Sequence, residues 1–138
     1  MLKQTTILVA DDEPYINRSL SFVLKQEGYH VVSTNDGQEA WEQLLGGVKP
    51  EIIFLDVMMP RLSGFELCQM IKSDARFQNI YVILLTARWQ ETDRKYAQTI
   101  GVDEYITKPF SPSNIIRRVN QICLERSGEQ DERCAKNS

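Results

Sequence analysis

Side chains capable of chemistry follow four short apolar runs of the chain. The polar residues and the runs that they follow are Asp11, Asp12 and Glu13 after 7–9, Asp56 after 52–55, Thr86 after 81–85, and Lys108 after 105–106. If the runs are strands of one parallel sheet, their carboxyl ends meet at one edge, which is where such sheets bind ligands. The sequence therefore predicts carboxylates, a hydroxyl and an ammonium at a shared site.

The three aspartates of this set need a cation or protons in order to coexist. Two like charges about 4 Å apart repel by roughly 4 kcal/mol at an effective dielectric constant of about 20. The ligands on offer are hard oxygen atoms, which suit Mg²⁺, with Mn²⁺ as a substitute. A carboxylate beside a cation and a lysine can also receive a phosphoryl group, so Asp56 is a candidate nucleophile for an aspartyl phosphate.

The elements that must position these residues are visible in the apolar pattern. Five strand-like runs (7–9, 30–33, 52–55, 81–85 and 105–106) are nearly continuous in hydrophobicity, as expected of strands buried on both faces. Helical spacing lies between them, with Pro14 at one helix start and pairs typical of capping boxes at Asp36 with Glu39 and Ser63 with Glu66. Alternation with right-handed crossovers predicts an α/β fold, a doubly wound five-stranded parallel sheet with helices on both faces.

Four stretches together resemble the receiver domain of two-component response regulators. They are ILVADDEP (7–14), FLDVMMP (54–60), LLTA (84–87) and GVDEYITKPF (101–110), and the likeness covers roughly residues 5–124. The resemblance implies a stand-alone regulator similar to those of chemotaxis, with the flavodoxin-like strand order 2-1-3-4-5. Residues 1–124 would form the receiver domain, and 125–138 a polar, disordered tail.

The resemblance also assigns roles to individual residues. Asp56 matches the phosphoacceptor, Asp11 and Asp12 match the acidic pair that holds Mg²⁺, and Met58 matches the residue whose carbonyl completes the metal shell. Thr86 matches the hydroxyl that moves to the phosphoryl group, Lys108 the lysine that contacts it, and Tyr105 the aromatic switch. The bond between Lys108 and Pro109 is expected to be cis, as in the family.

Simpler interpretations exist for several of these residues. Asp11 and Asp12 also suit a helix cap, and Thr86 and Tyr105 are also ordinary strand residues. The thin apolar content of the predicted helix 90–100 makes it a candidate for movement when Thr86 and Tyr105 rearrange.

Neighbouring residues are expected to tune the site and its assembly. Arg88, Trp89 and Met58 are expected near the phosphoryl pocket, where bulk would slow autodephosphorylation. Arg118 and Asp103 are candidates for ion pairs across a dimer.

Composition limits the partners and the compartment. The 138 residues carry a formal charge of −3, which argues against direct binding of nucleic acid, and no apolar run is long enough for membrane insertion. Three cysteines without C-x-x-C spacing, at 68, 123 and 134, together with no visible export signal, favour a reducing cytoplasm.

The leading hypothesis is a receiver that is phosphorylated by a histidine kinase or histidine phosphotransfer protein. Its surface formed by the fourth helix, fifth strand and fifth helix would then bind a downstream protein, and the chain would be a monomer or a phosphorylation-dependent homodimer. It would be no enzyme beyond its own phosphorylation and a weak autophosphatase activity. Alternatives are a dimeric receiver cut from a longer DNA-binding regulator, a module locked in one state, and an aspartyl-phosphate phosphatase. The phosphatase is disfavoured because Met58 stands where a second acid is expected.

Overall fold

The computed structural model describes residues 5–87 and 91–130, with only the backbone described at 91–93 and 127–130. Five strands and five helices alternate within these ranges. The elements are β1 (Thr6–Ala10), α1 (Pro14–Gln26), β2 (His30–Thr34), α2 (Gly37–Leu45), β3 (Ile52–Asp56), α3 (Gly64–Ser73), β4 (Tyr81–Thr86), α4 (Glu91–Thr99), β5 (Glu104–Thr107) and α5 (Pro112–Gln130). Each predicted run lies inside one of the strands.

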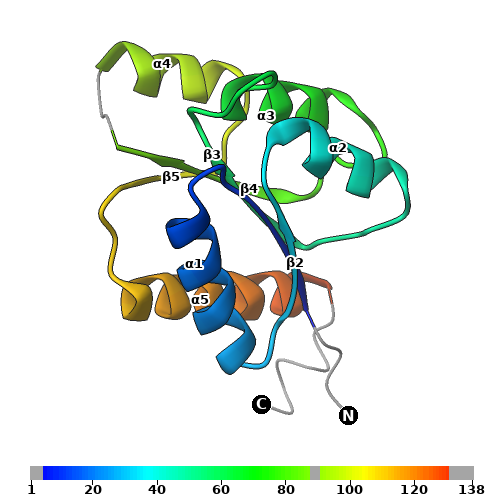
Figure 1. Cartoon of the computed structure of the whole chain (residues 1–138). Coiled ribbons are helices and arrows are strands. Elements are labelled where there is room, and N and C mark those ends of the chain that lie inside the picture. The colour runs from blue at the N-terminus through cyan, green and yellow to red at the C-terminus, as the bar shows by residue number, and fades with distance from the viewer. Residues whose placement is uncertain (1–4, 88–90, 131–138) are drawn as a thin grey trace.

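All strand pairs are parallel, and the strand order is β2-β1-β3-β4-β5. Helices α1 and α5 lie on one side of the sheet and α2, α3 and α4 on the other (Figure 1). The predicted doubly wound fold and its strand order are therefore confirmed. β3 lies at the centre of the sheet, and all five of its residues are buried. This burial explains its continuous hydrophobicity up to the final carboxylate.

Alternate residues of the strands point into two separate cores. Leu8 and Leu55 pack with α2 and α3, whereas Val9 and Phe54 pack with α1 and α5. Burying a side chain of this size contributes roughly 1.5–3 kcal/mol. Both faces of the sheet are thus fixed, and the carboxyl ends of β1, β3, β4 and β5 are held in register at one edge.

Side chains cap two helices beside that edge. Ser63 and Glu66 form the predicted reciprocal capping box at the start of α3, with Glu66 N–H donating to Ser63 Oγ and Ser63 N–H to Glu66 Oε1. Asp36 caps α2 by accepting from Glu39 N–H at 2.8 Å, but Glu39 Oε1 accepts from Asn35 N–H instead of the Asp36 backbone. Asp36 therefore caps α2, but the side chain of Glu39 bonds to the backbone of the preceding residue and a full capping box is not formed. Both helix starts are still stabilised by side-chain caps.

The structure agrees with the sequence-based expectation for α4 but not for the end of α5. In α4, residues 94–99 bury only Ala97, which agrees with the thin apolar content expected of this helix. The last helix was expected to end at about Leu124 but runs to Gln130, so residues 125–130 are helical and not part of a tail. Arg126 explains part of the extension, because its guanidinium donates to Asn79 O at 2.6 Å. Residues 131–138 lie outside the described part.

Within the described residues, no helix combines the length and the apolar content needed to cross a membrane.

Candidate functional site: a carboxylate cluster with one lysine

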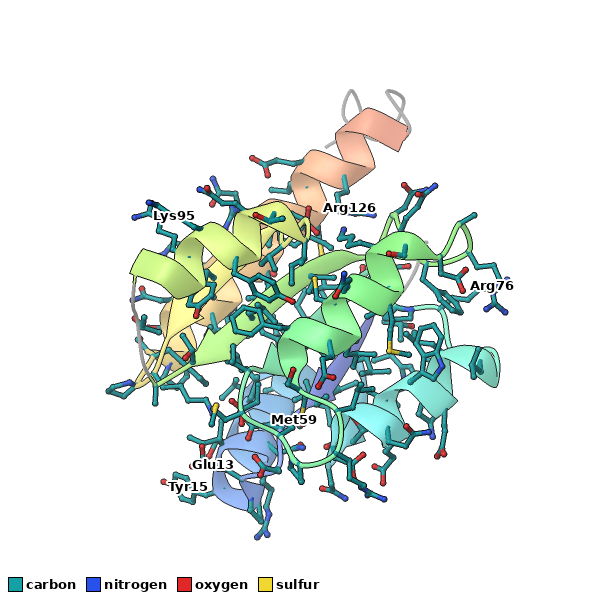
Figure 2. All side chains as sticks on the ribbon, turned by 90° about the horizontal axis from the view of Figure 1, so that it is seen from above. Glu13, Tyr15, Met59, Arg76, Lys95 and Arg126 are labelled. Carbon is teal, nitrogen blue, oxygen red and sulfur yellow. The ribbon has the colours of Figure 1, made fainter. Side chains whose placement is uncertain are left out.

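The sheet brings the predicted site residues together at the carboxyl ends of its strands. Ala10 pairs with Leu55 in the sheet register, so Asp11 and Asp56 leave adjacent strands side by side. Glu13 and Met59 lie at this end of the molecule in Figure 2, beside the start of α1. The site therefore follows directly from the strand order.

Lys108 crosses the end of the sheet and contacts three carboxylates. Its Nζ lies 3.0 Å from Asp11 Oδ2, 3.0 Å from Glu13 Oε1 and 3.5 Å from Asp56 Oδ1. The Lys108–Pro109 peptide bond is cis, as expected. Glu13 is the residue of this set to which sequence analysis gave no role. Its place next to the acidic pair was the available signal.

Burial and charge shift the protonation of the two central groups. Asp56 is 4% exposed, and this burial, followed by the charge of Asp11, raises the pKa of its carboxyl to about 7 against the opposing effect of Lys108. Burial alone would lower the pKa of Lys108, but its hydrogen bonds to Glu13 and Asp11 outweigh that effect and the pKa is raised. The lysine is firmly cationic, whereas Asp56 needs more positive charge to stay ionised at neutral pH.

The donor set fits a small hard divalent cation. Carboxylate oxygens of Asp11, Asp12 and Asp56 lie within 4.8 Å of one another. Asp11 is completely buried, and Lys108 supplies one positive charge to a cluster that includes Glu13 as a fourth carboxylate. Oxygen ligands and excess negative charge are what Mg²⁺ requires. The three aspartates fit the predicted Mg²⁺ site in both chemistry and spacing.

The other predicted residues surround Asp56. The backbone N–H of Met58 donates to Asp56 Oδ1 at 3.3 Å, while the Met58 side chain is exposed. Thr86 ends the neighbouring strand, is buried, and accepts a hydrogen bond at its backbone carbonyl from Lys108 N–H at 2.6 Å. Tyr105 pairs with Leu84 in the sheet register and is half-buried against the core on the α2 and α3 side.

Asn17 is a site component that sequence analysis missed. It lies on the buried face of α1, where its amide Nδ2 donates to Asp11 O at 3.0 Å and to Thr34 O at 2.6 Å. Its Oδ1 accepts from Ser21 Oγ at 3.3 Å and from Ser33 Oγ. The signal was a pair of polar residues, Asn17 and Ser21, at helical spacing within the apolar stripe of this helix.

Gly64 is the second missed component. A Cβ atom at this position would lie 2.5 Å from Asp56 O and 3.0 Å from Val57 Cα, a distance at which backbone must shift. Gly64 N–H also donates to Val57 O at 3.1 Å, which closes the loop after β3 onto the start of α3. A side chain here would displace the strand end that carries Asp56.

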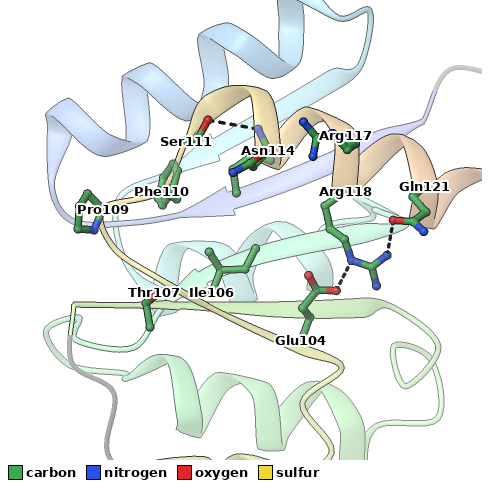
Figure 3. A pocket seen from close by; sticks show the side chains of 11 residues that line it. Glu104, Ile106, Thr107, Pro109, Phe110, Ser111, Asn114, Arg117, Arg118 and Gln121 are labelled. Atoms are coloured by element: carbon green, nitrogen blue, oxygen red, sulfur yellow. Dashed lines mark hydrogen bonds and ion pairs between the residues drawn. The ribbon is translucent and has the colours of Figure 1, made fainter.

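Arg118 and Asp103, which were predicted to pair across a dimer, each form an ion pair with another residue of this chain. Arg118 donates to Glu104 Oε1 at 2.7 Å and to Tyr81 Oη at 3.1 Å, and Figure 3 shows it between Glu104 and Gln121. Asp103 instead forms an ion pair with Lys72 at 2.7 Å. Arg88 and Trp89, which were expected beside the pocket, lie outside the described residues.

Comparison with known proteins agrees with this geometry. The family model of the response regulator receiver domain matches residues 7–120. The alkaline phosphatase synthesis transcriptional regulatory protein PhoP of Bacillus subtilis is 40% identical over 121 residues, covering 88% of this chain and 49% of that protein. The phosphate regulon transcriptional regulatory protein PhoB of Pseudomonas aeruginosa is 36% identical, covering 91% of this chain and 54% of that protein. The chain thus spans about half the length of these relatives.

Solved structures show the same fold. A CheY-like receiver domain protein of Methanospirillum hungatei superposes with a TM-score of 0.84 at 22% identity, covering 92% of this chain and 99% of that one. The response regulator DrrB of Thermotoga maritima, described as an OmpR/PhoB homologue, gives a TM-score of 0.77 at 33% identity over 91% of this chain and 54% of that one. On the family match, the sequence identities and the shared fold, the chain belongs to the response regulator receiver domain family.

Proposed function

We propose that this receiver takes a phosphoryl group from a phosphohistidine donor onto Asp56 and thereby changes a surface that controls a protein partner. The observation that carries the proposal is the environment of Asp56: a buried carboxylate at the end of the central strand, beside Asp11 and 3.5 Å from Lys108. A structural role alone does not account for a buried carboxylate among others of like charge.

Each site residue has a role in the transfer. An Asp56 carboxylate oxygen attacks phosphorus, so that a P–O bond forms while the P–N bond to the donor histidine breaks, and the histidine nitrogen takes a proton from solvent. Asp11, Asp12, Asp56 and the carbonyl of Met58 would hold Mg²⁺, which supplies positive charge for the phosphoryl oxygens. Lys108 contributes an ammonium to the same oxygens, and Thr86 donates one hydrogen bond from its hydroxyl.

The phosphoryl group adds up to about two negative charges and three strong acceptors at the end of β3. Lys108 then exchanges a carboxylate partner for a phosphoryl oxygen, and the end of β4 moves so that Thr86 reaches the group. Tyr105 lies on the next strand, opposite Leu84, and its ring repacks when β4 moves. Loosely packed α4 follows at low cost, and the surface of α4, β5 and α5 changes.

A groove on this surface supports its role in partner binding. The groove encloses about 470 Å³ between β5 and α5, with Ile106 and Phe110 among its apolar residues and Arg117 among its charged ones (Figure 3). Burial, and then the hydrogen bond to Glu104, raise the pKa of Tyr81 to about 12, so its hydroxyl remains a donor within the Glu104 and Arg118 network beside this groove.

The phosphodonor has a separate surface available on α1. Tyr15 and Phe22 are 80% and 60% exposed, two turns apart on one helix face, with Arg18 between them. An exposed apolar stripe of this kind suits the side of a partner helix. We propose that a helix of the histidine kinase or phosphotransfer protein docks here, one turn from the carboxylate cluster.

Cys68 and Cys123 are both free thiols, which fits a reducing cytoplasm.

A second candidate function is the receiver part of a longer transcriptional regulator that dimerises when phosphorylated. The observation in its favour is that the chain spans about half of the PhoP and PhoB relatives. Since Arg118 and Asp103 already have partners within the chain, a dimer that uses them requires these ion pairs to be exchanged. Sedimentation with and without phosphorylation tests the second function, because a phosphorylated chain that stays monomeric contradicts it.

The phosphorylation itself is tested by intact mass after incubation with a small phosphodonor and Mg²⁺. We expect one added phosphoryl group in the wild type and none in Asp56→Asn. Asp74→Asn is the matched control, because Asp74 is an aspartate far from the cluster, paired with Arg76, and it should be modified like the wild type. Equal modification of Asp56→Asn would contradict the proposal.

The lifetime of the phosphoryl group is the second measurement. We expect slow autodephosphorylation, because Met58 donates its backbone N–H to Asp56 and carries an exposed apolar side chain next to this carboxylate, which would limit the access of water. Met58→Asn, which replaces the apolar chain by one that can orient water, should speed the decay. An unchanged decay rate would contradict this role of Met58.

The switch is tested with a beryllofluoride mimic, which has activated the DrrB receiver domain. We expect the amide and side-chain signals of Thr86 and Tyr105 to move when beryllofluoride and Mg²⁺ are added together. Signals that stay unchanged between residues 86 and 110 would show that the proposed coupling is wrong.

A further inference from the structure

Asn17 occupies a polar position in the apolar interface between α1 and the sheet. Its neighbours on this helix face include Leu20 and Leu24, which are buried in the core of the α1 and α5 side. Asn17 is itself 4% exposed. A buried amide is costly unless its hydrogen bonds are made, and an apolar residue would fill the same space without that requirement. The amide is therefore expected to serve the groups that it binds.

All four hydrogen-bonding capacities of the Asn17 amide are used. The two donors of Nδ2 go to the backbone carbonyls of Asp11 and Thr34, and the two acceptor positions of Oδ1 receive the hydroxyls of Ser21 and Ser33. The acceptor side binds side chains that stabilise the network. The donor side binds the main chain at the ends of β1 and β2, where the acidic pair begins.

This arrangement fixes the peptide groups on both sides of Asp11. The Asp11 N–H donates to Thr34 O at 3.3 Å, and the Asp11 carbonyl accepts from Asn17. Thr34 is held in turn, because its Oγ1 donates to Val9 O at 2.9 Å. Asp11 Oδ1 accepts from Glu13 N–H at 2.9 Å, which orients its carboxylate. The peptide group that joins Asp11 to Asp12 is thus held directly by a hydrogen bond from the Asn17 amide.

From this geometry we infer that Asn17 is a positioning residue that sets the Mg²⁺ affinity of the receiver by holding the Asp11 and Asp12 half of the cluster. The inference rests on the proposed function of that cluster. Without the amide, the Asp11–Asp12 peptide loses its donor and can rotate, so the two carboxylates must be reordered whenever the cation binds. Groups that orient metal ligands typically change affinity by about 10–100-fold when removed.

The test measures Mg²⁺ binding to the unphosphorylated chain by calorimetry, with the wild type, Asn17→Ala and Asn120→Ala. Asn120 is the matched control, because it is also a helix asparagine bonded through its side chain, to Tyr29 and Glu27, far from the cluster. At a temperature where circular dichroism shows all three folded, we expect Asn17→Ala to bind about tenfold more weakly. Asn120→Ala should bind like the wild type.

The Mg²⁺ dependence of the phosphorylation rate distinguishes a loss of ligand positioning from a general loss of folding stability. Phosphorylation of Asn17→Ala by a small phosphodonor should be slow at low Mg²⁺ and approach the wild-type rate when Mg²⁺ is raised about tenfold. Asp56→Asn should remain unmodified at every Mg²⁺ concentration. If Asn17→Ala does not fold, Asn17→Ser, which keeps a hydroxyl, is compared in the same way and should also bind more weakly.

The outcomes distinguish this inference from the function on which it rests. A folded Asn17 variant whose Mg²⁺ affinity matches that of the wild type overturns the role of Asn17 while leaving the phosphoacceptor intact. A wild-type chain that neither binds Mg²⁺ nor takes a phosphoryl group overturns both.

Discussion

The buried carboxylate of Asp56 should make the metal-free protein less stable as the pH rises. Its pKa is raised from an ordinary value of 3.8 to about 7 in the fold, mainly by burial. The folded state therefore holds a proton that the unfolded chain has already released. Stability linked to this group is complete below the unfolded pKa and is lost as the pH rises through the folded one.

The size of the effect follows from the shift. About three pKa units at about 1.4 kcal/mol each give an upper bound of roughly 4 kcal/mol for the full loss. Between pH 5 and pH 8, about two of those units are crossed, or roughly 3 kcal/mol. Asp56→Asn keeps the shape of the side chain but cannot ionise, so its stability lacks this decline.

Urea unfolding of both proteins in the presence of a chelator measures the difference. The stability advantage of Asp56→Asn over the wild type should grow from pH 5 to pH 8 by up to about 3 kcal/mol. Saturating Mg²⁺ at pH 8 should stabilise the wild type more than the variant, since the cation favours the ionised carboxylate.

Asp74→Asn is the control for this measurement. Its side-chain hydrogen bond to Arg76 lowers the pKa of Asp74, so this substitution should give no advantage that grows with pH. An Asp56→Asn advantage that is equal at pH 5 and pH 8 would refute the reasoning, because it would place the Asp56 pKa outside this window.

Three further predictions concern the backbone around the site. Gly64→Ala places a Cβ atom 2.5 Å from Asp56 O, so we expect roughly 1–3 kcal/mol lower stability in urea together with slower phosphorylation; a wild-type phosphorylation rate would show that the strand end is not displaced. Arg61 has a φ of 68° and forms an ion pair with Asp36 at 2.5 Å. Arg61→Gly and Arg61→Ala both lose the pair, but only glycine relieves the left-handed backbone, so Arg61→Gly should be more stable in urea by about 1 kcal/mol; equal stabilities would contradict this. Ser63→Ala removes the cap of α3 and should lower the midpoint of thermal unfolding, at a cost of about 1 kcal/mol; an unchanged midpoint would show that the cap contributes nothing.

Much of the fold follows from the sequence because its signals are local. The buried run that ends at Asp56, the proline that opens α1 and the capping box at Ser63 each specify their own element without reference to the rest of the chain. Strand order then places Asp11 beside Asp56. The predicted end of α5 was wrong because residues 125–130 are polar and gave no helical apolar pattern. The hydrogen bond between Arg126 and Asn79 that holds this segment against the rest of the domain joins residues far apart in the sequence.

The missed parts of the site are also contacts between distant residues. The sequence places Glu13 at the shared edge of the sheet, but its ion pair with Lys108 is visible only in the folded chain. Asn17 is unusual only when the face of α1 that contains it is known to be buried. The sequence did not indicate that Arg118 forms an ion pair within its own chain. Its partner Glu104 lies on the adjacent strand.

The hydrogen bond from Lys108 N–H to Thr86 O ties together the two residues proposed to touch the phosphoryl group. Neither backbone can advance toward Asp56 without drawing the other along, so intermediate positions with only one of them engaged are disfavoured. We therefore expect the receiver to switch between two conformations without populated intermediates. The fraction of molecules in the second conformation would then report the degree of phosphorylation.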